Sequence, residues 1–172
     1  MAQMAPQQRD SFLAERRVAV LGIAREGSGP LLAPIWFRYE PATTAFTFCM
    51  AGSSAKARRL AAAQRATVCV QGEDFPYRYV VAEGPVTVRL LGEETYEQVR
   101  AMATRYLGED AGRRYADQFA TPDEVLVTLI PSRWQAEIPG PAAAKPGAAE
   151  SVAAKPAAAR APDPTGSAGT QA

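Results

Sequence analysis

Four cations stand in a stretch of the chain that has no acidic residue. Between Glu40 and Glu73 there is neither Asp nor Glu, and within this window residues 52–60 read GSSAKARRL, with a further cation at Arg65. A helix that begins after Ser53 or Ser54 directs its unpaired N–H groups and the positive end of its dipole toward the preceding loop. Cations in such a first turn oppose the dipole unless an anion lies there. The segment therefore indicates either a phosphate or carboxylate site or a solvated basic helix face.

Helical spacing divides these cations into two groups. Lys56 and Arg59 lie three positions apart and share one helix face. Arg58 points about 200° around the wheel from Lys56, at about 100° per residue, so it is expected on the surface. Arg65 lies at the far end of the predicted helix, where a cation suits the negative end of the dipole. The predicted anion site thus rests on Lys56 and Arg59.

The chain contains no histidine. This excludes Ser-His-Asp and Cys-His nucleophilic machinery, histidine-based zinc sites and the usual haem ligand, and no metal site is predicted. The two cysteines, Cys49 and Cys69, each stand within an apolar run. They are expected to be small buried residues of a reducing compartment, although a disulfide between them stays open. If the protein is an enzyme, a cofactor must supply its chemistry.

Composition divides the 172 residues into a domain and two tails. Residues 1–8 are expected to be disordered, residues 9–138 to form one cofactor-binding domain, and residues 139–172, which are mostly Ala, Pro, Gly and Ser, to form a disordered tail. In residues 1–138 the 16 Lys and Arg balance the 16 Asp and Glu, so a nucleic-acid surface is not indicated. No apolar signal core or membrane-length run occurs, and a cytoplasmic protein is predicted.

Periodicity predicts a meander of strands interrupted by helices. Pro34 cannot donate a ladder hydrogen bond, which favours an edge, bulge or bend, and Gly84-Pro85 predicts a bulge or corner. This order favours a small antiparallel barrel. Strands are expected at residues 18–24, 31–39, 45–50, 66–71, 77–91 and 125–130, and helices at 9–15, 54–64, 93–107 and 110–119.

Four segments in this order resemble a known family. They are Pro34-Ile35-Trp36-Phe37, the helix start Lys56-Ala57-Arg58-Arg59-Leu60, Tyr77-Arg78-Tyr79-Val80 leading to Glu83-Gly84, and Ile130-Pro131-Ser132-Arg133. Together they resemble the pyridoxamine 5'-phosphate oxidase-like split barrels, and within these the actinobacterial flavin- and deazaflavin-dependent oxidoreductases. The resemblance covers residues 12–134. It implies a mainly β fold with helices (α+β), an antiparallel split β-barrel of about six strands with short helices inserted.

The basic helix departs from the pattern of that family. The usual pattern is Lys-Ala-Arg-Asn-Leu followed by Asp-Pro, whereas here Arg59 replaces the Asn and Ala63-Gln64 stand in place of Asp-Pro. The added cation would suit a coenzyme with more negative groups than FMN.

The resemblance also implies a homodimer with a cofactor in each of two clefts at the subunit interface. In that picture Lys56, Arg59, Ser53, Ser54 and the backbone near Gly52 hold the phosphate. Pro34, Ile35, Trp36 and Met50 line the ring system, although composition alone favours the core for Trp36, because an aromatic residue in a half-buried strand needs no further explanation. Arg78, Tyr79 and Trp134 are the candidates that a partner subunit contributes, and Tyr79 is a weak candidate for a catalytic proton donor.

The function expected from this resemblance is a cofactor-dependent reductase. It would transfer a hydride from reduced deazaflavin coenzyme (F-420) or FMN to an electron-poor organic small molecule. The alternative is a non-enzymatic flavin or deazaflavin binding or carrier protein. A nucleic-acid-binding barrel is disfavoured by the balanced charge. The residues leave open which cofactor and which substrate are used.

Overall fold

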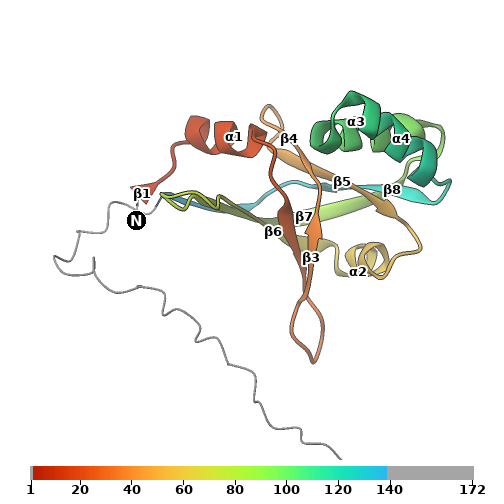
Figure 1. Ribbon diagram of the computed structural model, residues 1–172. Helices are drawn as coiled ribbons and strands as arrows, with labels where there is room; N and C mark the ends of the chain where they lie inside the picture. The colour runs from red at the N-terminus through yellow and green to blue at the C-terminus, as the bar shows by residue number, and fades with distance from the viewer. Residues whose placement is uncertain (1, 139–172) are drawn as a thin grey trace, which may run out of the picture. The chain divides into compact units, whose positions relative to one another are not determined.

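The computed structural model describes residues 2–138. The tail predicted at 139–172 lies outside the described residues. Within residues 2–138 the chain forms nine strands in one antiparallel sheet, joined by four α-helices and one short 3-10 helix (Figure 1). Among these residues no helix combines the length and apolar character that a bilayer crossing requires.

The strands follow the order β3-β2-β6-β7-β8-β5-β4, and in addition β9 pairs with β7 and β1 pairs with β9 (Figure 1). Their bounds are β1 Ala2–Gln3, β2 Ala19–Ile23, β3 Leu31–Ile35, β4 Arg38–Glu40, β5 Ala45–Ala51, β6 Arg65–Gln71, β7 Tyr79–Leu90, β8 Glu124–Leu129 and β9 Arg133–Ile138. The first and last strands of this order, β3 and β4, are joined by only Trp36 and Phe37. A sheet whose two edges are linked by so short a connection must curl round on itself, which gives the split barrel.

The longest strand, β7, belongs to both parts of the barrel. Its residues 79–83 pair with β9, and its residues 86–90 pair with β8. The change of partner falls at Gly84-Pro85, where a Cβ on residue 84 would lie 2.1 Å from the carbonyl oxygen of Ile130. Only glycine permits this approach of two backbones. The predicted interruption at Gly84-Pro85 is therefore a corner of the barrel.

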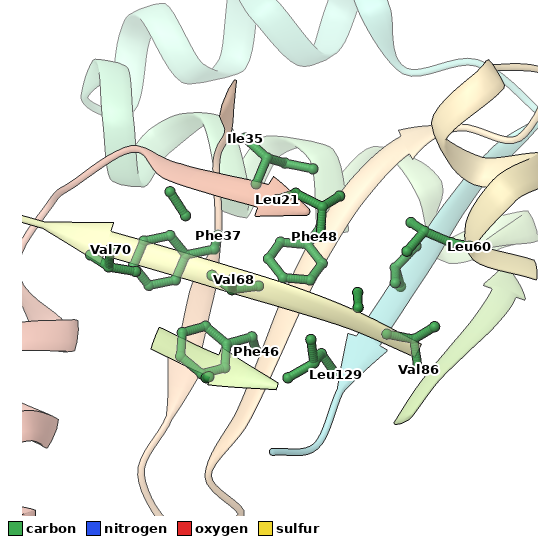
Figure 2. Packing of buried hydrophobic residues seen from close by; sticks show 14 of the residues in the cluster. Leu21, Ile35, Phe37, Phe46, Phe48, Leu60, Val68, Val70, Val86 and Leu129 are labelled. Atoms are coloured by element: carbon green, nitrogen blue, oxygen red, sulfur yellow. The ribbon is translucent and has the colours of Figure 1, made fainter. Parts of the chain in front are cut away.

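The core fills the concave side of the sheet (Figure 2). Alternate residues of each strand point inward, as in β6, where Ala66, Val68 and Val70 are buried and their neighbours are not. Burial of each large apolar side chain contributes about 1.5–3 kcal/mol. The largest buried side chains include Phe12, Phe37, Phe46, Phe48, Leu21 and Leu60.

The helices are α1 Pro6–Ala14, α2 Ala55–Ala63, α3 Thr95–Leu107 and α4 Glu109–Phe119, with the 3-10 turn η1 at Gly92–Glu94 before α3. All four lie within about three residues of the predicted bounds. The pair α3 and α4 lies over the end of the sheet formed by β5 and β8 (Figure 1). It belongs to the connection between β7 and β8.

Residues 2–8, for which disorder was predicted, include β1 and the start of α1. Ala2 and Gln3 pair with Ile138 and Glu137 of β9, and α1 begins at Pro6. Proline suits the first turn of a helix because its missing N–H is not needed there. Strand β9, which follows the stop signal of Pro131 and was not predicted, offers the edge that orders the N-terminus.

The strand predicted over residues 31–39 is divided in two. The N–H of Phe37 donates to the hydroxyl of Tyr106 at 2.9 Å instead of to a neighbouring strand. The same hydroxyl donates to the carbonyl of Arg17 at 2.8 Å. A side chain of α3 thus satisfies the backbone where the chain crosses from β3 to β4. This division, together with β1 and β9, accounts for nine strands where about six were expected. Pro34 lies in the edge strand β3, as its missing N–H predicts.

Candidate functional site

A cavity of about 480 Å³ lies between the β5 and β8 part of the sheet, the start of α2, and the helices α3 and α4. Four of the predicted cofactor-binding residues line it: Trp36, Met50, Ser54 and Lys56. These residues come from three separate segments of the chain. The fold therefore gathers part of the predicted site into one chamber.

The strands supply the floor of this cavity. Ala51 lies opposite Glu124, and Cys49 lies opposite Leu126, in the antiparallel pairing of β5 with β8. Because opposed residues of an antiparallel pair point to the same side, Cys49, Ala51 and Glu124 share one face of the sheet. All three line the cavity. Val99 and Met102 of α3 provide an apolar roof over this face.

The start of α2 supplies a cation and backbone donors. Ser54 is the N-cap, and its hydroxyl accepts from the N–H of Ala57 at 3.2 Å. The N–H groups of Ala55 and Lys56 belong to the first turn and have no acceptor within the helix. Lys56 is partly buried, and its ammonium forms no hydrogen bond or ion pair with any residue between 2 and 138. An unpaired cation at the positive end of a helix dipole is a favourable place for an anion.

The loop before α2 differs from the prediction. The N–H of Gly52 donates to the carbonyl of Asp123 at 2.8 Å, and the N–H of Ser53 donates to the Asp123 carboxylate at 3.2 Å. That carboxylate also accepts from the hydroxyl of Thr121 at 2.6 Å, and these hydrogen bonds lower the pKa of Asp123, with Thr121 the largest cause. The backbone donors near Gly52 and Ser53 thus already have an acidic partner from the loop before β8. Residues 41–72 contain no acidic residue, but the fold places the Asp123 carboxylate next to this segment.

The arginines of the basic segment lie outside the cavity. Arg58 is exposed and donates to the carbonyl of Ser53. Arg59 is exposed and is not among the residues that line the cavity. Arg65 does not serve the end of α2, because Gln64 adopts a left-handed conformation (φ 52°) that ends the helix. It begins β6 instead and pairs with Glu83 at 2.8 Å.

Aromatic side chains form one wall of the cavity. The rings of Trp36 and Tyr106 stack with centroids 4.8 Å apart and planes 7° apart. Tyr115 of α4 tilts against Trp36 at 5.3 Å, and Phe119 follows at 4.7 Å from Tyr115. The Tyr106 hydroxyl is fixed by hydrogen bonds to Arg17 and Phe37, so the Tyr106 ring supports the face of Trp36 on which it stacks. The wall is therefore a rigid platform with one aromatic face toward the cavity.

Two of the residues predicted to line the cofactor ring do not line this cavity. Pro34 is exposed on the edge strand β3, and Ile35 is buried in the core with 7% of its surface exposed. Of these three neighbouring residues only Trp36, in the connection between β3 and β4, lines the chamber.

The residues predicted to come from a partner subunit also lie elsewhere in the chain. Arg78 and Tyr79 line a second cavity, which has no lining residue in common with the first. Arg78 contacts the Glu15 carboxylate at 3.4 Å, and the Tyr79 hydroxyl accepts from Gln135 at 2.9 Å. A hydrogen bond with Glu137 is the main cause of a raised pKa at Tyr79. Trp134 packs near the core beneath Arg9, whose guanidinium lies 4.1 Å from the ring centroid. Within one chain, none of the three reaches the Lys56 cavity.

The prediction missed the buried carboxyl of the cavity. Glu124 has 8% of its surface exposed, and neither carboxyl oxygen forms a hydrogen bond or ion pair with any residue between 2 and 138. Burial, and then the charge of Asp123, raises the pKa of Glu124. Burial, and then the charge of Glu124, raises the pKa of Cys49 to about 12. In the sequence Glu124 stands only as the polar residue before an apolar strand, and no pattern shows that helices cover it.

No protein-family model matches the sequence, and no curated protein matches it significantly. Solved structures do match. A conserved hypothetical protein from Mycobacterium tuberculosis is 20% identical, with a TM-score of 0.65 over 78% of this chain and 85% of that protein. An F-420 reductase is 20% identical, with a TM-score of 0.62 over 73% of this chain and 94% of that protein. A pyridoxamine 5'-phosphate oxidase-like protein from Listeria innocua is 14% identical, with a TM-score of 0.58 over 76% and 96%.

These likenesses establish the fold. The chain has the split-barrel fold of these proteins, which agrees with the fold expected from the resemblance seen in the sequence. Its site is an aromatic-walled cavity with a lysine at a helix N-terminus.

Proposed function

We propose that this protein is a flavin- or deazaflavin-dependent reductase. The observation that carries the proposal is the unpaired Lys56 ammonium at the N-terminus of α2, in the same cavity as the Trp36 platform. One of the matched structures is an F-420 reductase, which supports a cofactor of this class.

The donors of the cavity fit such a cofactor. Its phosphate needs a cation and N–H donors, which Lys56 and the first turn of α2 supply. Its ring system needs a flat apolar wall, which Trp36 and Tyr115 supply. The cation and the wall border one chamber, so a single molecule could contact both.

In this proposal the chain binds the cofactor, orients its ring and shields it from bulk water. Lys56 holds the phosphate end, and the aromatic wall fixes the plane of the ring. Val99 and Met102 of the roof keep bulk water from the reacting face. When bound, the reduced cofactor supplies the hydride, so the protein contributes position and electrostatics.

Arg59 does not favour a cofactor richer in negative charge than FMN, because its side chain is exposed and lies outside the cavity. Lys56 can bind the phosphate of either FMN or coenzyme F-420, so both cofactors are proposed.

The test is a fluorescence titration of the purified protein with FMN, FAD and oxidised F-420. We expect at least one to bind with a micromolar or lower Kd, about −8 kcal/mol or stronger. No binding by any of them would overturn the proposal. A panel of activated enones and quinones then separates a reductase from a carrier, because only a reductase consumes the reduced cofactor faster than the protein-free solution does.

We further propose that two copies of the chain assemble through the outer face of the sheet. One row across this face joins Pro34 of β3, Val20 of β2, Cys69 of β6 and Val81 of β7. The row is apolar, and Val20 and the neighbouring Leu32 are 38% and 63% exposed. An exposed apolar patch of this kind is typical of an interaction surface. Tyr79 lies on the same face, two residues from Val81, so assembly would place it beside the partner.

A further inference from the structure

Glu124 is a buried carboxyl without a protein partner, facing a cavity. It lines the chamber from the first position of β8, directly opposite Ala51 of β5, and only 8% of its surface is exposed. Buried carboxyl groups are normally satisfied by hydrogen bonds or cations. The side chain of Glu124 has neither within residues 2–138, so it is available to a bound molecule.

The charged and titratable groups around Glu124 come from several elements. Cys49 of β5 and Tyr115 of α4 line the same cavity and are neutral in their ordinary forms at neutral pH. Asp123, the preceding residue, is a carboxylate that opposes a second negative charge. Arg38 of β4 acts on Cys49, and α3 contributes only the apolar Val99 and Met102. Lys56 is the one cation among the residues that line the cavity.

This arrangement favours the neutral acid. Burial reduces the solvation of a carboxylate, and Asp123 repels it, so the pKa of Glu124 is raised. A neutral carboxylic acid that faces a bound molecule can donate a proton to it. After donation, the cation of Lys56 on the same cavity wall offsets part of the cost of the new carboxylate.

We propose that Glu124 is the proton donor of the reduction, and an alkene conjugated to an electron-withdrawing group serves as the probe substrate. This inference rests on the proposed function. The β-carbon of the alkene accepts a hydride from the reduced flavin or deazaflavin, and the π electron pair moves to the α-carbon. The α-carbon then takes the proton of Glu124, which becomes a carboxylate and regains a proton from water. The alkene gains two electrons and two hydrogens, and the cofactor is oxidised by two electrons.

The experiment compares Glu124→Gln and Glu124→Asp with the unaltered chain. Gln keeps the shape of the side chain but carries no acidic proton, and Asp keeps the acid at a shorter reach. The control is Glu93→Gln, which makes the same substitution at an exposed residue of η1 that lies outside the cavity. Thermal unfolding of each variant verifies the fold.

The first measurement does not depend on turnover. Carbon-13 NMR of glutamate-labelled protein follows each carboxyl against pH, and the signal lost in Glu124→Gln identifies residue 124. We expect this signal to titrate above the ordinary range of glutamates. We also expect Glu124→Gln to bind FMN or F-420 as tightly as the unaltered chain, because a neutral carboxyl is exchanged for a neutral amide of the same shape.

The second measurement is the rate of enone reduction under single-turnover conditions. We expect Glu124→Gln to slow this step about 100-fold or more, with partial recovery in Glu124→Asp. The rate of the unaltered chain should fall as pH rises through the pKa of Glu124, and the residual rate of Glu124→Gln should not depend on pH there. Glu93→Gln should match the unaltered chain.

Two results would overturn the inference alone, with cofactor binding intact. One is a Glu124 carboxyl that titrates at its ordinary value, and the other is an undiminished rate in a folded Glu124→Gln. Failure of every cofactor to bind the unaltered chain, or absence of turnover across the enone panel, would remove the proposed reaction and this inference with it.

Discussion

Lys56 and Arg59 lie on the same side of α2, yet only one of them reaches the cavity. Lys56 lines it, whereas Arg59 is exposed to solvent. Helical spacing alone cannot separate them, because residues three apart share a face. The difference arises from the direction of the helix, since the first turn points at the chamber and the next residues point past it.

This contrast gives the first prediction. Lys56→Ala should weaken cofactor affinity about tenfold or more, a loss of about 1.4 kcal/mol, because it removes the only cation lining the described cavity. Arg59→Ala removes the same charge from the same helix and should cost less. Kd values from fluorescence titration at matched ionic strength decide the point. An equal loss in both variants would show that bulk charge attracts the cofactor, without a specific contact.

The predicted site and the observed cavity agree where local sequence decides the position. Ser54 caps a helix and Lys56 follows it, and both are readable from residues 53–60 alone. Glu124 and Tyr115 were not predicted as cavity residues. Their place depends on the pairing of β8 with β5 and on the path of α4, which are contacts between segments about 70 residues apart in the chain. Such pairings leave no periodic trace in either segment.

At the scale of elements, the barrel turns its corner in β7. Gly84-Pro85 was readable as an interruption because neither residue suits the middle of a strand. Strands β1 and β9 were not readable, since β1 has two residues and takes its order from β9. The break between β3 and β4 was missed as well, because the hydroxyl of Tyr106 stabilises it from α3.

The corner carries the second prediction. Gly84→Ala would place a Cβ 2.1 Å from the Ile130 carbonyl oxygen, so two backbone segments must separate. We expect a loss of about 1–3 kcal/mol in the free energy of unfolding, measured by urea denaturation. Gly29→Ala is the matched control, since a Cβ added at residue 29 would meet no atom within 4 Å. Its effect should stay within about 0.5 kcal/mol. An unchanged free energy of unfolding in Gly84→Ala would contradict the close approach of the two backbones.

At the scale of the whole molecule, Glu124 links pH to folding. Its pKa is raised in the folded state, so the folded chain binds more protons than the unfolded chain. The contribution of Glu124 to the free energy of unfolding should therefore fall as pH rises from the unfolded pKa, about 4.3, to the folded pKa of this residue. Each unit of separation between the two is worth about 1.4 kcal/mol.

The third prediction isolates this contribution. Glu124→Gln removes the titrating group, and the other carboxyls are common to both proteins. The stability of Glu124→Gln relative to the unaltered chain should increase with pH across this window and then level off. Urea denaturation at a series of pH values measures the difference. A difference that stays constant with pH would mean that Glu124 titrates alike in the folded and unfolded states.

The fourth prediction concerns assembly. If the outer face of β2, β3, β6 and β7 joins two copies, Val20→Glu should yield monomers, because it places a charge within the apolar row. Leu90→Glu is the control, because Leu90 is 59% exposed but lies in the part of β7 that pairs with β8. Sedimentation equilibrium distinguishes the states. A monomeric unaltered chain, or a dimer that survives Val20→Glu, would exclude this face.

The connection between β7 and β8 has an evolutionary consequence. Leu90 and Val125 are paired neighbours in the sheet, so the two strand ends already lie side by side, and the helices α3 and α4 stand entirely between them. A short turn could close the same gap and leave the strand pairing intact. The roof of the cavity can therefore be lengthened, shortened or replaced in related chains while the barrel and the Lys56 helix are inherited unchanged. Selection for new substrates would then act on the segment that covers the cavity.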